Sequence, residues 1–135
     1  MKELTLAATV ENIAAVTDFV NAELETADCP MKAQMQIDLA IDEIFANIAQ
    51  YAYAPGTGMA TVRFALQPDP RTAVLTFLDS GIPYNPLEKE DPDTTLSAEE
   101  REIGGLGILL IKKTMDAVEY IRTNGQNVLT VRKRF

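Results

Sequence analysis

The stretch 101-REIGGLGILLIKKTMD-116 places three glycines within four residues, directly before an amphipathic run. Glycine costs about 0.5–1 kcal/mol relative to alanine inside a helix or strand, so this stretch indicates a sharp bend or a close approach of the backbone to another group. Two interpretations are open. The glycines form a tight loop that leads into a helix, or their backbone N–H groups and the helix N-terminus bind an anion such as phosphate.

The chain before this stretch predicts a strand and two helices. Residues 4–9 alternate as in a short strand, and residues 10–26 have helical apolar spacing with Thr9 as the expected N-cap. A long helix is expected from about Met31 to Ala54, where a Pro- and Gly-rich segment ends it. Its inward-facing stripe is predicted to be Met35, Ile37, Ala40, Ile41, Ile44 and Ile48.

The second half predicts two hairpins separated by a polar loop and a third helix. Residues 59–67 and 72–78 form the first hairpin, and VEYIRT and NVLTVRKR form the last around Asn124-Gly125, a dipeptide favoured in type I′ turns. Between them, residues 82–103 lack periodicity and residues 106–115 are amphipathic. The order β-α-α-β-β-loop-α-β-β predicts one α+β domain, residues 1–135, as a two-layer sandwich with helices on one face of a largely antiparallel sheet.

Composition excludes several classes of function. The sequence has no histidine, so Ser-His-Asp and Cys-His catalysis and histidine autophosphorylation are impossible within it. Its one cysteine, Cys29, excludes an internal disulfide and a cysteine-cluster zinc site, and fits a reducing cytoplasm. The net charge of −8 argues against nucleic-acid binding. The chain carries neither a signal-peptide pattern nor an apolar run of the ~20 residues that span a membrane, so no membrane partner is expected.

Two further stretches carry residues suited to chemistry. In 42-DEIFANIAQYAY-53, Glu43 and Asn47 lie on one face of the predicted helix, either as a solvated flank or as a pair that binds a divalent cation and activates a hydroxyl. In 75-LTFLDSGIPYNP-86, Asp79 follows an apolar strand and Gly81 comes two residues later. This is either a strand-ending Asx turn, or an aspartate that accepts a hydrogen bond from a ligand amine while Gly81 leaves room for a flat ring.

The glycine run alone fits neither a Walker A loop nor a Rossmann fingerprint. The ordered set E-x-x-x-N, D-x-G-x-P, a variable loop and G-G-L-G-I, however, resembles the N, G1 and G2 boxes of the GHKL ATPases. It is most similar to the anti-sigma factor serine/threonine kinases and their stand-alone ATP-binding relatives. The resemblance covers nearly the whole chain and implies a Bergerat-type sandwich that holds Mg-ATP beneath a mobile lid at about residues 82–105.

The resemblance also implies a role for each matching residue. Glu43 would be the general base for the acceptor hydroxyl, Asn47 would bind Mg²⁺, Asp79 would accept from the adenine amino group and Gly81 would line the base pocket. The residues that would cradle the phosphates at the helix N-terminus are Gly104, Gly105, Leu106 and Gly107.

Four other positions are less closely tied to the boxes. Arg101 is the nearest cation for a γ-phosphate, with a solvated lid residue as the alternative, and Thr130 either joins the adenine network or only packs in its strand. Tyr51 stands where relatives often carry histidine, a departure expected to be harmless. Asn85 stands where many carry aspartate, and this departure puts the anchoring of the lid in doubt.

The leading functional prediction is a cytoplasmic kinase that phosphorylates a serine of a small antagonist (anti-anti-sigma) protein. A sigma factor as a second partner and a homodimer are suggested by the resemblance alone. The main alternative is a nucleotide-gated binding module with little or no phosphotransfer, against which the intact Glu43 argues. A detached ATPase domain of a histidine kinase or larger machine, and a purely structural domain, are weaker alternatives.

Overall fold

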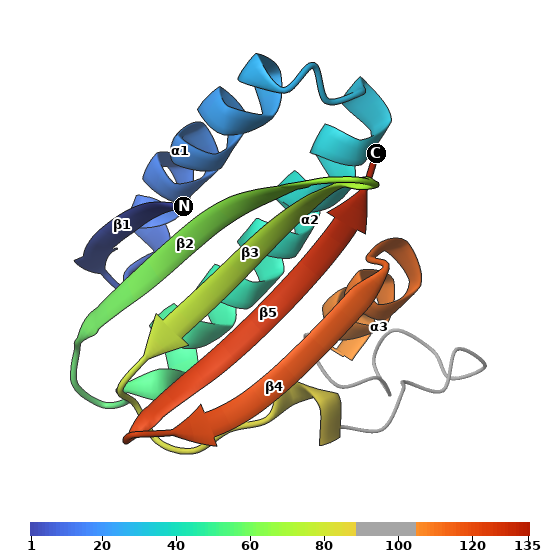
Figure 1. The fold of residues 1–135 in the computed structure, drawn as a ribbon. Helices are drawn as coiled ribbons and strands as arrows, with labels where there is room; N and C mark the ends of the chain where they lie inside the picture. The colour runs from blue at the N-terminus through green and yellow to red at the C-terminus, as the bar shows by residue number, and fades with distance from the viewer. Residues whose placement is uncertain (89–104) are drawn as a thin grey trace.

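The protein consists of one β-sheet and a layer of helices. The computed structural model describes residues 1–88 and 105–135, and in the second segment it describes the side chains from Gly107 onward. Within these residues, five strands form one antiparallel sheet in the order β1-β2-β3-β5-β4 (Figure 1). The strands are β1 (Lys2–Ala7), β2 (Met59–Pro68), β3 (Arg71–Asp79), β4 (Ala117–Thr123) and β5 (Gln126–Arg134). The predicted hairpins, β2–β3 and β4–β5, are therefore confirmed.

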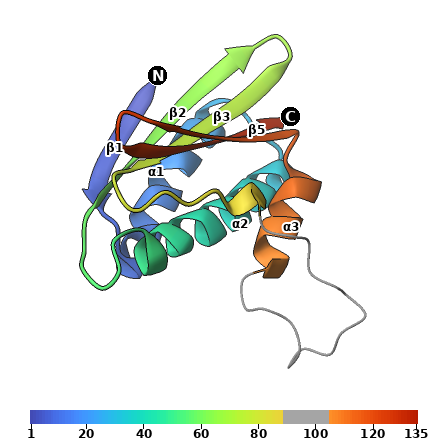
Figure 2. The same cartoon turned by 90° about the horizontal axis from the view of Figure 1, so that it is seen from below.

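The helices cover one face of this sheet (Figure 2). They are α1 (Ile13–Thr26), α2 (Met31–Asn47) and α3 (Gly105–Thr114), with a 3₁₀ turn, η1 (Val10–Asn12), before α1 and a π-helical turn, η2 (Ile48–Ala52), after α2. A further 3₁₀ turn, η3 (Pro86–Glu88), follows β3. The predicted α+β two-layer sandwich is confirmed.

The core lies between α1, α2 and the inward face of the sheet. Alternate residues of β3 point into it, and Ala73, Leu75 and Phe77 are almost completely buried. From α2, Ile37 and Phe45 meet them with no exposed surface. This packing fixes α2 across the middle of the sheet, so that its C-terminal turns lie beside the end of β3.

The helices differ from the sequence expectation in three ways. Thr9 makes no side-chain cap hydrogen bond, and Asn12 Nδ2 instead donates to the Ala7 carbonyl at 2.8 Å. The long helix changes to π-helical geometry after Asn47 and ends at Ala52. The prediction that Met35 faces inward is wrong, because it is 57% exposed. Two residues along a helix turn the side chain by about 200°, so Met35 points away from the sheet when Ile37 points toward it.

The closing hairpin turns as the sequence predicts. Asn124 and Gly125 have φ values of 52° and 74°. Positive φ at both central residues is the requirement of a type I′ turn, which matches the twist of the flanking strands. The turn fixes the register between β4 and β5. On its other side β5 pairs with β3, and that separate register sets Asn127 directly opposite Asp79.

Candidate functional site

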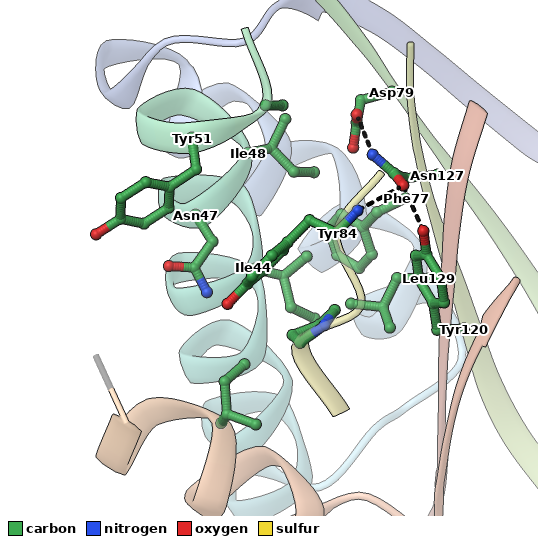
Figure 3. Close-up of a pocket in the computed structure, with 13 residues that line it drawn as sticks. Ile44, Asn47, Ile48, Tyr51, Phe77, Asp79, Tyr84, Tyr120, Asn127 and Leu129 are labelled. Atoms are coloured by element: carbon green, nitrogen blue, oxygen red, sulfur yellow. Dashed lines mark hydrogen bonds between the residues drawn. The ribbon is translucent and has the colours of Figure 1, made fainter. Parts of the chain in front are cut away.

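A pocket lies between the C-terminal end of α2 and the sheet, where β3 ends and β5 begins (Figure 3). Its walls are largely apolar, with Ile44 and Ile48 on the helix side and Phe77 and Leu129 on the sheet side. A pocket with apolar walls and a few polar groups suits a flat organic ligand. The polar side chains that line it are Asn47, Tyr51, Asp79, Tyr84, Tyr120 and Asn127.

Asp79 and Asn127 form the polar centre of this pocket, and both are only 6% exposed. Asp79 Oδ1 accepts from Asn127 Nδ2 and from the Gly81 backbone N–H, each at 2.9 Å. Within the described part of the chain, both of these donors go to Oδ1, which leaves Oδ2 to accept from a ligand amine. A buried carboxylate is costly unless it is hydrogen-bonded, so this arrangement holds Asp79 in one orientation before any ligand arrives.

Asn127 is satisfied by four separate groups. Its Nδ2 donates to Asp79 and also to the Ile82 carbonyl at 2.7 Å, and its Oδ1 accepts from Tyr120 Oη at 2.5 Å and from the Tyr84 N–H at 3.2 Å. Figure 3 shows this chain of contacts running from Tyr120 through Asn127 to Asp79. Asn127 therefore ties β3, β4, β5 and the segment after β3 together at the wall of the pocket.

Gly81 is held against the end of the long helix. A Cβ placed on it would lie 2.6 Å from the carbonyl carbon of Ala52 in η2. Because this atom belongs to the backbone, the overlap could not be relieved by a side-chain rotation. The next residue, Ile82, donates its N–H to the Ala52 carbonyl at 2.9 Å, and Arg122 Nη1 donates to the Gly81 carbonyl at 2.7 Å. Close backbone packing therefore requires glycine here.

Glu43 and Asn47 lie together on α2, as their spacing on the helix predicts, and Asn47 lines the pocket on the side away from Asp79. Asn47 Nδ2 donates to Glu43 Oε1 at 3.5 Å, and both side chains are half-buried. Gly107 of α3 packs directly against this carboxylate, and a Cβ there would lie only 2.5 Å from Glu43 Oε1 and closer still to Cδ and Oε2. Any side chain at position 107 would displace the Glu43 carboxylate.

These residues fit a nucleotide and a metal in their donor chemistry. With its Nδ2 turned to Glu43, the Asn47 amide presents its oxygen as a ligand, and Mg²⁺ commonly takes one or two protein oxygens together with phosphate oxygens and water. Within the described residues, no group of three or more His, Cys, Asp or Glu side chains could hold a metal by itself.

Of the predicted site residues, Asn47 and Asp79 line the pocket, and Gly81 donates its backbone N–H to Asp79 beside it. Glu43 contacts Asn47 but lines a neighbouring groove, where Gly107 lies against it. Gly105 begins α3, and Leu106 follows it, so the predicted phosphate contacts lie at a helix N-terminus. Arg101 and Gly104, like most of the predicted lid, lie outside the described residues.

Thr130 is not brought to the pocket. It pairs with Thr76, and along β5 the buried positions are Asn127, Leu129 and Val131, so Thr130 points to the opposite face of the sheet. The sequence analysis missed Asn127. The alternation in N-V-L-T-V nevertheless indicates it, because Asn127 is a polar residue in the inward-facing series with Leu129 and Val131.

In the described parts of the chain, no helix combines the length and the apolar character that crossing a membrane requires.

The sequence is similar to a known family of ATPase domains and to two named kinases. Residues 6–133 match the histidine kinase-like ATPase domain family. The serine/threonine-protein kinase BtrW of Bordetella bronchiseptica is 30% identical over 100 residues, which is 74% of this chain and 70% of BtrW. The serine-protein kinase RsbW of Bacillus mycoides is 33% identical over 95 residues, 67% of this chain and 58% of RsbW. The names of these relatives support a serine/threonine kinase activity.

Two solved structures share the fold. A chain of the SiaB–SiaC complex from Pseudomonas aeruginosa superposes with a TM-score of 0.60 at 18% identity, over 98% of this chain and 89% of that one. The histidine kinase domain of a blue-light activated kinase from Erythrobacter litoralis has a TM-score of 0.52 at 12% identity, over 93% of this chain and 60% of that one. With its sequence match over residues 6–133, this chain belongs to the family of histidine kinase-like ATPase domains, which implies that it uses ATP.

Proposed function

We propose that this protein is a Mg-ATP-dependent kinase of the partner-switching type that phosphorylates a serine of a small antagonist (anti-anti-sigma) protein. The observation that carries the proposal is the Glu43–Asn47 pair: Asn47 lines the Asp79 pocket, and Glu43 lies beside it against Gly107 of α3. Relatives of the RsbW and BtrW type support a kinase regulator of this kind.

In the proposed binding mode, Asp79 recognises the adenine amino group. Its Oδ1 is already committed to Gly81 and Asn127, so Oδ2 is the acceptor for the ligand. The apolar walls, including Ile48 and Phe77, would enclose the base. The phosphates would then extend toward Asn47 and the N-terminus of α3, where Gly105, Leu106 and Gly107 offer backbone N–H groups and the positive end of the helix dipole.

Asn47 is the proposed protein ligand of Mg²⁺, through its amide oxygen. When bound, Mg²⁺ neutralises phosphate charge, which phosphoryl transfer needs more than it needs covalent catalysis by the protein. Arg101 and Gly104 remain proposed phosphate contacts. Thr130 lies on the opposite face of the sheet, which does not support a contact with adenine. Asn127, which donates to Asp79, is the proposed member of the adenine network in its place.

The transfer step assigns Glu43 as general base. The acceptor serine oxygen forms a bond to the γ-phosphorus of ATP, and the bond from that phosphorus to the β–γ bridging oxygen breaks. The serine proton goes to the Glu43 carboxylate and ADP leaves. Hydrogen bonding from Asn47 and the tight contact with Gly107 support this role because they keep the carboxylate at one position.

The remaining parts of the proposal concern the setting. We place the protein in the cytoplasm as one domain, residues 1–135, with a sigma factor as a second partner and a homodimer as the assembly. The family resemblance supports these points, and cosedimentation of the chain with a sigma factor, with and without ATP, tests the second partner.

The test is phosphotransfer from γ-labelled ATP, with Mg²⁺, to an antagonist-domain protein encoded beside this chain, followed by phosphoserine detection. Nucleotide binding is measured separately by melting temperature, since a ligand at 100 times its Kd adds about 2.7 kcal/mol to stability. No shift at millimolar Mg-ATP would overturn the ATP site. ATP-dependent partner binding without transfer would make the protein a nucleotide-gated binding module.

A further inference from the structure

A line of side chains on α2 leads to the proposed general base. Met31, Met35 and Leu39 are spaced four residues apart, and the next position in the series is Glu43. These three apolar residues, here called the apolar ridge, are 69%, 57% and 59% exposed. Large apolar side chains gathered on one exposed face commonly mark an interaction site.

Beside the ridge, a groove runs between α2 and α3. Its floor contains Ala40 and Ile111, which are 1% and 4% exposed, and its rims carry Leu39 and Leu110, which are 59% and 52% exposed. The charged side chains among its described lining residues are Asp42 and Glu43, and both are acidic. The groove therefore offers an apolar floor with a negative border on the α2 side.

The groove and the nucleotide pocket meet at one pair of residues. Glu43 lines the groove, Asn47 lines the pocket, and Asn47 Nδ2 donates to Glu43 Oε1 at 3.5 Å. If the nucleotide fills the pocket side, an acceptor hydroxyl that gives its proton to Glu43 arrives from the groove side. Gly107, which also lines the groove, places no side chain in this approach, where a Cβ would overlap the carboxylate.

We infer that the groove and the apolar ridge dock the phosphoacceptor protein, an inference that rests on the proposed kinase function. The surface that fits carries apolar side chains next to the acceptor serine and at least one lysine or arginine beside them. The apolar groups pack between Leu39 and Leu110, and the cation pairs with Asp42. Docking there delivers the serine hydroxyl to Glu43.

Two other occupants match this surface less well. A second copy of this chain, packed groove to groove, would bring two acidic borders, each with Asp42 and Glu43, into one interface and would close the approach to Glu43. An anionic lipid surface would be repelled by the same carboxylates, in a chain of net charge −8. Charge complementarity therefore favours a basic, apolar protein segment.

Steady-state phosphotransfer to the antagonist-domain protein used above tests the inference with Leu39→Lys and Leu110→Lys. Truncating or charging a central apolar contact commonly costs a tenfold loss of affinity or more, so we expect KM for the acceptor protein to rise about tenfold while the Kd for Mg-ATP is unchanged. Ile121→Lys is the matched control, because Ile121 is 53% exposed on β4, on the sheet rather than on the groove. Its KM should equal that of the wild type.

A charge reversal sharpens the test. Asp42→Lys should raise KM for the acceptor, and a lowered KM would overturn the assignment of a basic partner. Methyl NMR on ¹³C-methionine-labelled protein reads the ridge directly: Met31 and Met35 signals should shift on addition of the acceptor, while Met59, 54% exposed on β2, should not.

The outcomes separate this inference from the function on which it rests. A wild type that transfers no phosphate overturns the kinase proposal and the docking assignment with it. A wild type that transfers phosphate, with an unchanged KM in Leu39→Lys and Leu110→Lys, overturns the docking assignment alone. Loss of self-association in these variants, at unchanged KM, would identify the groove as a dimer contact and would also overturn it.

Discussion

The pocket beside Asp79 is held by hydrogen bonds between buried polar groups, whereas the groove beside Glu43 is shaped by close packing and apolar surface. At the first site, Asn127 connects β5, β3 and β4 and fixes the Asp79 carboxylate. At the second site, Gly107 limits the position of the Glu43 carboxylate by close packing. The proposed recognition site thus gains its orientation from satisfied polar partners, and the proposed transfer site gains its orientation mainly from shape.

The largest effect is expected for Glu43→Gln. The amide keeps the shape of the side chain but cannot take the serine proton, and loss of a general base costs about 10²–10⁴ in rate. Phosphotransfer should fall by that factor while calorimetric affinity for Mg-ATP stays at the wild-type value. Asn47→Ala is the companion variant, since removal of the proposed metal ligand should lower both the transfer rate and the affinity for Mg-ATP. Transfer by Glu43→Gln at the wild-type rate would show that the base is misassigned.

Gly107→Ala tests whether shape alone positions the carboxylate. The added methyl overlaps the Glu43 carboxylate, and a displacement of about 1 Å can cost roughly 10²-fold in rate. We expect a loss of phosphotransfer of about this size. The displaced atoms are the far end of a flexible side chain, so the melting temperature should change little. Phosphotransfer by Gly107→Ala at the wild-type rate would show that this glycine does not position the carboxylate.

Asp79→Asn tests the recognition site. The amide can present a donor where the adenine amino group also donates, and hydrogen bonds to charged groups contribute roughly 1.5–3 kcal/mol, so nucleotide affinity should fall about ten- to a hundredfold. Titration calorimetry with ATP and GTP measures the change. Unchanged ATP affinity together with equal preference for GTP would contradict the role of Asp79.

Asn127→Ala should weaken the framework of the pocket. It leaves the Ile82 carbonyl, Tyr120 Oη and one Asp79 hydrogen bond without their partner, and a buried polar group left unsatisfied costs about 1–3 kcal/mol. The free energy of unfolding in urea should fall by about that amount. A loss below about 0.5 kcal/mol would mean that water replaces the amide, and the network would then be less rigid than described.

The smallest effect is expected for Thr130→Val, which compares the two faces of β5. Because Thr130 points away from the pocket, the substitution should change nucleotide affinity by no more than about 0.5 kcal/mol, the usual range for surface positions. Calorimetry beside Asn127→Ala measures the contrast. A loss as large as that of Asp79→Asn would return Thr130 to the adenine network.

Local sequence was sufficient for the elements and for the pair on the helix. Alternation and helical spacing depend on neighbouring residues, so the order of strands and helices, both hairpins and the type I′ turn at Asn124-Gly125 follow from them. Glu43 and Asn47 lie within one helical turn, and their contact needs no information from the rest of the chain. The prediction for Met35 failed because apolar character alone did not show which side of α2 faces the sheet.

Tertiary structure decided the contacts between residues far apart in sequence. Asn127 reaches Asp79 across 48 residues only because the β3–β5 register sets them opposite each other, and no local pattern encodes that register. Gly107 meets Glu43 only because α3 packs beside α2. Sequence by itself determined which side chains this chain carries and on which elements. The packing of those elements decided which of them touch, because strand register and helix contact depend on the whole core.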